Sequence, residues 1–254
     1  MTERLDWADA VRVGFIELST SLAMSAEVPG ALPPGVRPLL TRLRLPGGEV
    51  SAAALDRMVA SDRLEEASRE LADGGARVVA FACTTGSLIR GKGFDRELVE
   101  RMERASGTRA TTTSTALLAA LSALGARTVA VATPYVAELN DLEAGFLEEH
   151  GHEVTALRGL GIETDPEIAR VPYARTRTLA LEALAEGGDA DAVFISCTNL
   201  PTLALLEGLE ADAGRPVISS VAVTIWHALA LAGVPASIPG LGSLLAGRAA
   251  RLVV

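Results

Sequence analysis

The second half of the chain repeats parts of the first half in the same order. Three pairs of segments carry the repeat: residues 11–16 resemble 127–132, residues 76–84 resemble 190–198, and residues 113–114 resemble 219–220. Within the second pair, Cys83 and Cys197 are 114 positions apart and each follows an apolar run. An internal repeat of this kind predicts two similar structural units, each with one cysteine in an equivalent place.

Short apolar runs alternate with helical stretches along the chain. Strands are expected at 12–18, 77–82, 128–133, 192–196 and 216–219, and helices at 51–73, 115–124, 135–149 and 172–186. Several helical stretches end in glycine, the usual helix stop. Alternation of strand and helix is typical of parallel βαβ units. Together with the repeat, it predicts an α/β protein of two similar Rossmann-like lobes with parallel sheets, related by a pseudo-two-fold axis.

The repeat also predicts where the chain passes between the lobes. The hydroxyl pairs at 113–114 and 219–220 each precede an apolar helix, and we expect both helices to act as crossovers. The first lobe is then residues 1–112 together with a returning segment, 221–254. The second lobe is residues 113–220.

Composition excludes several classes of protein. Hydrophobic residues make up 49% of the chain and charged residues 22%, which is a globular balance rather than that of a disordered chain. The net charge of −9 and the aromatic content of 4% provide no basic or base-stacking surface, so we expect no nucleic-acid partner. No apolar run reaches the roughly 18 residues of a membrane helix, and the N-terminal segment lacks the order of a signal peptide. We therefore expect no membrane partner and a cytoplasmic location.

The two cysteines are the candidate reactive groups. In a reducing compartment, a lone pair of cysteines is more often catalytic, redox-active or simply buried than joined in a disulfide. Cys83 and Cys197 are expected at the carboxyl ends of parallel strands, which is where such sheets bind ligands. Free N–H groups at a following helix start would hold a carboxylate and lower the pKa of a thiol. We therefore expect two opposed free thiols, at least one of them reactive near neutral pH; the alternative is two ordinary buried side chains.

Several motifs resemble those of the aspartate/glutamate racemase superfamily, and within it the branch that holds maleate cis-trans isomerase, arylmalonate decarboxylase and the racemase-like protein of ectoine utilisation. The motifs are residues 13–16 (VGFI), 82–87 (ACTTGS), 90–91 (RG), 112–115 (TTST), 132–135 (ATPY), 161–162 (GI) and 196–202 (SCTNLPT). The likeness covers nearly the whole chain, and the string CTNLPT is typical of the isomerases. In the decarboxylases a glycine normally occupies the position of Cys83, so the presence of both cysteines favours isomerisation or racemisation.

The resemblance implies a reaction without cofactor or metal in the cleft between the lobes. Cys83 would be the nucleophile or first acid/base, and Cys197 its counterpart on the opposite side. The groups that would hold a substrate carboxylate are Thr84, Thr85, Tyr135 and the backbone around Thr198. The implied function is an isomerase or racemase that acts on a small carboxylic acid, at the carbon next to the carboxylate. A malonate-type decarboxylase, or a binding protein without turnover, is the alternative.

The chain departs from the isomerase pattern at two carboxylate-binding positions. Ser21 stands where those enzymes have an asparagine, in a loop where Leu18 replaces a proline, and Asp165 replaces a second asparagine. An anionic Asp165 would repel a second substrate carboxylate at about 4 Å by roughly 4 kcal/mol at an effective dielectric of about 20. We therefore expect Ser21 and Asp165 at the mouth of the cleft, where they disfavour maleate. The sequence leaves open whether the protein is a homodimer.

Overall fold

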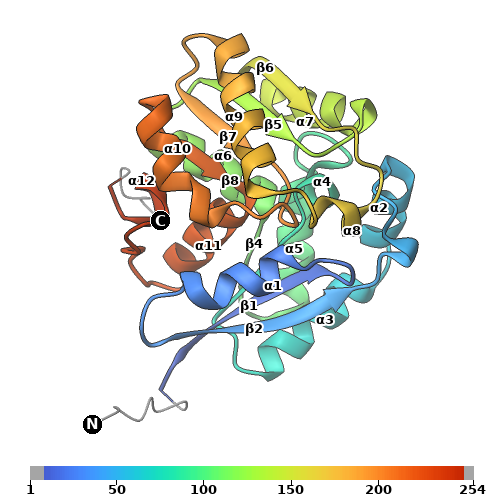
Figure 1. The fold of residues 1–254 in the computed structure, drawn as a ribbon. Helices are drawn as coiled ribbons and strands as arrows, with labels where there is room; N and C mark the ends of the chain where they lie inside the picture. Colours follow the sequence, from blue (N-terminus) through green and yellow to red (C-terminus); the bar gives the residue numbers. More distant parts are fainter. Residues whose placement is uncertain (1–8, 249–254) are drawn as a thin grey trace.

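The computed structural model describes residues 9–248, which form two parallel β-sheets surrounded by helices (Figure 1). The strands are β1 (Val11–Leu18), β2 (Val36–Leu43), β3 (Val78–Phe81), β4 (Arg109–Thr112), β5 (Thr128–Thr133), β6 (Glu153–Gly159), β7 (Ala192–Ile195) and β8 (Val217–Ser219). The first sheet has the order β2-β1-β3-β4 and the second the order β6-β5-β7-β8, with parallel pairing between all of these neighbours. The two sheets share one topology, which confirms the predicted α/β fold of two similar lobes.

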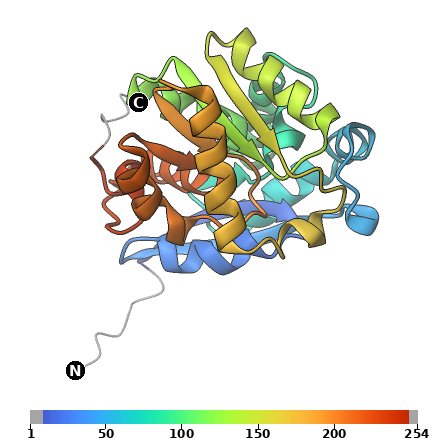
Figure 2. The same ribbon diagram turned by 45° about the horizontal axis from the view of Figure 1, so that its top comes forward.

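Helices cover both sheets. The α-helices are α1 (Ala23–Glu27), α2 (Ala52–Val59), α3 (Arg63–Asp73), α4 (Thr84–Leu88), α5 (Phe94–Ser106), α6 (Thr113–Leu124), α7 (Ala137–Glu149), α8 (Asp165–Ile168), α9 (Tyr173–Gly187), α10 (Leu206–Ala213), α11 (Ser220–Leu231) and α12 (Gly242–Leu245), and the 3₁₀ helices are η1 (Val28–Ala31), η2 (Pro46–Gly48) and η3 (Leu203–Leu205). Figure 1 shows β1 and β2 in the lower part of the molecule and β5 and β6 in the upper part, and Figure 2 shows the blue N-terminal elements again at the bottom. Within residues 9–248, no helix is both long and apolar enough to cross a membrane.

The stretches 1–8 and 249–254 lie outside the described residues. The first of them carries the sequence from which we expect a cytoplasmic location, and the second is the end of the predicted returning segment of the first lobe. Both expectations therefore stay predictions for these stretches.

β3 and β7 are the matching strands that lead to the two cysteines. All of their residues are 0 or 1% exposed, and a parallel strand buried on both faces needs such a continuous apolar run. β3 ends two residues before Cys83, and β7 ends two residues before Cys197. The repeat thus places both cysteines just beyond the carboxyl ends of equivalent strands.

α6 and α11 are the two apolar helices that begin at the hydroxyl pairs. The side chains of Thr112 and Ser219 cap them, each accepting a hydrogen bond from a backbone N–H group three residues on. The helices pack against each other, with the hydroxyls of Thr113 and Thr224 at 2.8 Å, and α11 also contacts β3 and β4 of the first sheet. The chain thus comes back to the first sheet after β8, whereas the lobe boundaries at residues 112 and 220 stay a prediction.

Some local predictions need correction. The single helix expected at 51–73 is two helices, α2 and α3, because the chain turns at Ser61, whose hydroxyl donates to the carbonyl oxygen of Met58 at 2.8 Å. The five expected strands match β1, β3, β5, β7 and β8 to within one residue at each end. The sequence interpretation missed β2, β4 and β6, which are edge strands with partly exposed, polar residues.

Candidate active site

The two thiols are buried and lie in one site between the sheets. Cys83 and Cys197 are free cysteines, 3% and 5% exposed, and they interact electrostatically with each other. The hydroxyl of Thr198 donates to the carbonyl oxygen of Ala82 at 3.0 Å, so the residues that follow β7 contact those that follow β3. The ends of two strands from different sheets therefore meet at the cysteines.

Each sulfur accepts a hydrogen bond from a nearby backbone N–H group. The N–H of Gly86 donates to Cys83, and the N–H of Asn199 donates to the Sγ of Cys197 at 3.3 Å. Cys197 has a φ of 86° and is the only non-glycine residue with positive φ among residues 9–248. Such a backbone costs on the order of 1–3 kcal/mol and is typical of functional sites, so the fold holds this cysteine in an unfavourable conformation.

The expectation of an acidic thiol is wrong. Burial raises the pKa of Cys83 to about 12, and burial raises the pKa of Cys197 further. The negative charge of Asp165 adds to both rises, and the N–H groups of Gly86 and Asn199 oppose them without compensating. The helix after Cys83 has only five residues, so its N-terminal field is weak. Burial thus favours the protonated form of both thiols.

Gly86 leaves the space that the thiol of Cys83 occupies. A Cβ atom at Gly86 would lie 2.8 Å from the Sγ of Cys83 and 3.3 Å from both Met58 and Phe81. We expect Gly86→Ala to displace the thiol, to lower turnover at least about tenfold and to lower the free energy of unfolding by about 1–3 kcal/mol. The measurements are steady-state kinetics and urea unfolding.

Gly208 is the matched control for Gly86. It also lies within a helix, α10, and a Cβ atom there would meet no atom within 4 Å. Gly208→Ala should therefore raise the stability by about 0.5–1 kcal/mol and leave turnover unchanged. Full activity in Gly86→Ala would show that the position of the Cys83 thiol does not depend on this glycine.

The residues expected to hold a carboxylate are all buried around the thiols. The hydroxyl of Thr84 lies 2.8 Å from that of Ser220. Thr85 hydrogen-bonds to Cys83, and Tyr135 hydrogen-bonds to Cys197. Together with the Thr198 contact to the other strand end, these bonds place the four residues beside the cysteines; their role in binding substrate stays a prediction.

Ser21 and Asp165 are buried, each 2% exposed, instead of lying at an open mouth. The hydroxyl of Thr20 donates to the Oδ2 of Asp165 at 2.6 Å, while the hydroxyl of Ser21 has no hydrogen-bond partner among the described residues. Burial raises the pKa of Asp165, and hydrogen bonds from Thr20 and Asn199 oppose that rise. Asp165 acts electrostatically on both cysteines, so it lies closer to the chemistry than the sequence interpretation expected.

Asn199 connects this site to the first lobe, and the sequence interpretation gave it no role. Its Oδ1 accepts from the N–H groups of Leu22 and Ala23 at 2.7 and 3.0 Å. Its Nδ2 donates to the carbonyl oxygen of Asp165 at 2.8 Å. Its place two residues after Cys197, in the motif 196–202, was the available signal.

Glu143 is a second residue that the sequence interpretation missed. It is fully buried on α7, and the hydroxyl of Ser196 donates to its Oε1 at 2.6 Å. The buried positions of α7 are Leu139, Glu143, Phe146 and Leu147, so Glu143 occupies a core position in the helical spacing. A carboxylate at a core position of an amphipathic helix was the signal in the sequence.

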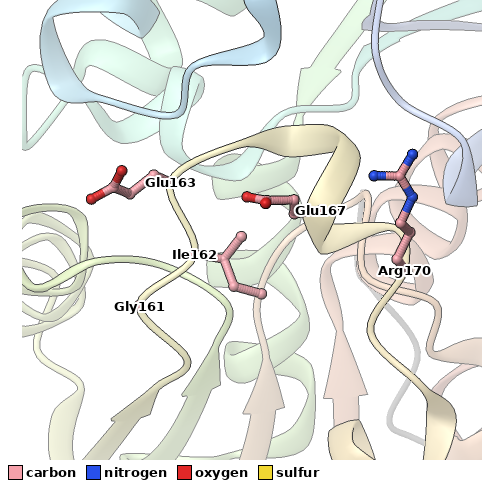
Figure 3. A pocket seen from close by; sticks show the side chains of 5 residues that line it. All are labelled: Gly161, Ile162, Glu163, Glu167 and Arg170. Carbon is pink, nitrogen blue, oxygen red and sulfur yellow. The ribbon is translucent and has the colours of Figure 1, made fainter.

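An open groove of about 550 Å³ lies along the segment that carries Asp165. It is lined by Gly161, Ile162, Glu163, Glu167 and Arg170 (Figure 3). Asp165 and Glu167 belong to the same short helix, α8, but Asp165 is buried and Glu167 is exposed. The groove therefore borders the exposed side of this segment. Asp165, on the buried side of the segment, interacts electrostatically with the thiols.

Comparisons with known proteins identify the family of this chain. A family model described as arylmalonate decarboxylase matches residues 40–245. Arylmalonate decarboxylase of Bordetella bronchiseptica is 37% identical over 198 residues, covering 78% of this chain and 82% of the relative. A maleate isomerase of Pseudomonas putida is 26% identical over 244 residues, covering 93% of this chain and 97% of the relative.

Similar solved structures are of the same two kinds of enzyme. A double mutant of arylmalonate decarboxylase in the liganded form has a TM-score of 0.85 at 34% identity and covers 92% of this chain and 98% of that one. A cysteine-to-serine mutant of the Nocardia farcinica maleate cis-trans isomerase, with a covalently bound succinylcysteine intermediate, has a TM-score of 0.86 at 27% identity and covers 93% and 98%. Since the family model spans most of the sequence, the chain belongs to the arylmalonate decarboxylase family, a group of cofactor-independent enzymes related to the maleate isomerases.

Proposed function

We propose that this protein is a two-cysteine isomerase or racemase that acts at the carbon next to the carboxylate of a small acid. The observation that carries the proposal is the pair of buried, free, mutually interacting thiols at equivalent strand ends. Decarboxylation needs one proton donor, whereas chemistry on both faces of one carbon needs two opposed groups. A relative with a succinylcysteine intermediate supports covalent chemistry at a cysteine of this fold.

The reaction needs one thiolate and one thiol, so one of the two cysteines must first lose its proton to solvent. We assign the thiolate to Cys83, because burial and Asp165 raise the pKa of Cys197 further. The Cys83 thiolate takes the proton next to the carboxylate, the electron pair moves into the carboxylate, and Cys197 gives its proton to the opposite face. Cys83 ends as a thiol and Cys197 as a thiolate. With an activated C=C bond, the Cys83 thiolate instead adds to one carbon and Cys197 gives its proton to the other, so that the double bond becomes a single bond. This bond rotates, Cys197 takes a proton back, and the bond between carbon and the Cys83 sulfur breaks, which restores the thiolate and gives the other geometry.

The side chains around the thiols fit the carboxylate that this chemistry requires. Thr84, Thr85, Tyr135 and the backbone around Thr198 are proposed to hold it and its enolate-like intermediate, where preorganised donors stabilise developing charge. Ser21 supports a further contact, because its buried hydroxyl has no partner among the described residues.

The second candidate function is decarboxylation of a malonate-type diacid. The family model and the 37% identity to arylmalonate decarboxylase favour it. The raised pKa of Cys197 also suits a proton donor. Cys83 is the feature that this candidate leaves without a role.

The deciding experiment is an NMR screen in deuterated water with maleate, aspartate, hydroxy acids and arylmalonates. Isomerisation or deuterium incorporation next to the carboxylate, without release of carbon dioxide, is the expected result. Release of carbon dioxide would replace the proposal with the decarboxylase. Binding of an acid without exchange or turnover would show a binding protein.

Asp165 and Ser21 are proposed to exclude a second carboxylate. We expect the double variant Asp165→Asn, Ser21→Asn to raise kcat/KM for maleate at least about tenfold, because it removes a repulsion of roughly 4 kcal/mol. Asp165→Asn keeps the backbone carbonyl that Asn199 binds, so the segment stays anchored. The single variant Ser21→Asn serves as the control, and unchanged maleate kinetics in the double variant would remove Asp165 from substrate selection.

A cytoplasmic location and a homodimer belong to the same proposal. Cell fractionation tests the first, and sedimentation equilibrium of the purified chain tests the second. A membrane-bound fraction or a monomer would contradict them.

A further inference from the structure

A chain of hydrogen bonds leads from a buried carboxyl group to one of the thiols. The hydroxyl of Ser196 lies 2.6 Å from the Oε1 of Glu143, and Tyr135 hydrogen-bonds both to Ser196 and to Cys197. Glu143, Ser196, Tyr135 and Cys197 are each at most 5% exposed, and the second carboxyl oxygen of Glu143 has no partner among the described residues. The chemistry proposed above uses the last two groups and gives the first two no role.

The number of hydrogens on the four side chains decides the direction in which these hydrogen bonds run. Ser196 and Tyr135 each have a single hydroxyl hydrogen, and an ionised carboxylate only accepts. When Glu143 is ionised, Ser196 must donate to it, so Tyr135 donates to Ser196 and its oxygen accepts from the thiol of Cys197. When Glu143 carries a proton, it can donate to Ser196, which donates to Tyr135, which then donates to the sulfur of Cys197.

We propose that Glu143 is a positioning residue for Cys197. The protonation state of Glu143 sets the direction of the hydrogen bonds through Ser196 and Tyr135. A Tyr135 hydroxyl that donates to the sulfur stabilises the thiolate, and one that accepts from it stabilises the thiol. Protonated Glu143 thus favours Cys197 as a base, and ionised Glu143 favours it as a proton donor. The consequence for catalysis rests on the proposed function, whereas the direction of the hydrogen bonds does not.

The surroundings of Glu143 leave it free to titrate near neutral pH. Burial raises its pKa to about 7, and the Ser196 hydrogen bond opposes the rise. α7 packs against α4, which has no titratable side chain, and against β6, whose Glu153 and Arg158 are exposed. On the side of the site, Tyr135 interacts electrostatically with Glu143 and Cys197, and Cys197 interacts with Asp165 and Cys83. The other acidic groups of α7 are Glu138, Asp141, Glu148 and Glu149.

The chain contains two tyrosines, which makes a direct test possible. In protein labelled with ¹³Cζ-tyrosine, the Tyr135 resonance should move in a step with a midpoint of about pH 7, as Glu143 ionises. Glu143→Gln should abolish this step, because an amide does not titrate in this range. Ser196→Ala should abolish it as well, since it removes the link while keeping Glu143, and it tests the proposal even if Glu143→Gln does not fold.

Glu27 provides the matched control. Burial raises its pKa to about 7 as well, but its carboxylate accepts from the N–H groups of Thr202 and Leu203, and it acts on the other tyrosine, Tyr173. Glu27→Gln should therefore keep the Tyr135 step and alter only the titration of Tyr173. A Tyr135 step that persists in Glu143→Gln, or that Glu27→Gln removes, would overturn the proposal, as would its absence from the unmodified protein.

The S–H stretch of Cys197 gives a second measurement that needs no substrate. Cys83→Ser leaves a single thiol in the chain, so its infrared band belongs to Cys197. The band should move to lower frequency as pH rises through about 7, because the thiol becomes a hydrogen-bond donor to Tyr135. In Cys83→Ser combined with Glu143→Gln, a band that still moves with pH would contradict the proposal.

Discussion

Replacing Cys197 with serine is expected to lower kcat by about 10³–10⁴, the upper range for loss of a positioned acid or base. A serine hydroxyl is a much weaker acid than a thiol, so it cannot supply the proton to the opposite face of the carbon. The loss is expected for isomerisation, racemisation and decarboxylation alike, since each of them needs this proton donor. The measurement is kcat on the acid found in the deuterium screen.

The fold should survive this change. Serine is close to cysteine in size, and the N–H of Asn199 can donate to a serine oxygen as it does to the sulfur. Tyr135 can hydrogen-bond to the serine hydroxyl as it does to the thiol. We expect the free energy of unfolding to change by less than about 1 kcal/mol. Near-normal activity in a folded Cys197→Ser variant would remove this residue from the mechanism.

The sequence predicts the central strands well because their physical situation is simple. β1, β3, β5 and β7 lie inside the sheets, so they need apolar side chains on both faces and stand out as apolar runs. β2 and β6 are edge strands with exposed positions, and β4 has the sequence RATT. Their polar patterns resemble those of loops, and only the pairing with a neighbouring strand makes them strands.

The candidate site is predictable in part for a similar reason. The repeat identifies Cys83 and Cys197 because equivalent strands lead to both. The pKa of each thiol depends on how far it is buried and on Asp165, a residue distant in sequence. The residues at a helix start show neither the burial of the thiol nor the position of Asp165. The sequence interpretation therefore predicted a lowered thiol pKa instead of a raised one.

Replacing Cys83 distinguishes the two candidate functions. In Cys83→Ser, we expect isomerisation or racemisation to fall by about 10³, because one of the two opposed acid/base groups is lost. Cys197 still faces one side of the carbon, so a racemase should retain slow deuterium exchange into one enantiomer without inversion. Both properties are measured by chiral chromatography and NMR of the product formed in deuterated water.

Cys83→Gly tests the decarboxylase directly, because it produces the residue that decarboxylases normally have at this position. If the chain is a two-thiol isomerase, this variant should lose turnover of the natural substrate as fully as Cys83→Ser does. A Cys83→Gly variant that releases carbon dioxide from an arylmalonate at an undiminished rate would show that Cys197 suffices and that Cys83 is not part of the mechanism. Since Cys83 is buried at 3% exposure, unfolding in urea must accompany each assay, so that a loss of fold is not mistaken for a loss of chemistry.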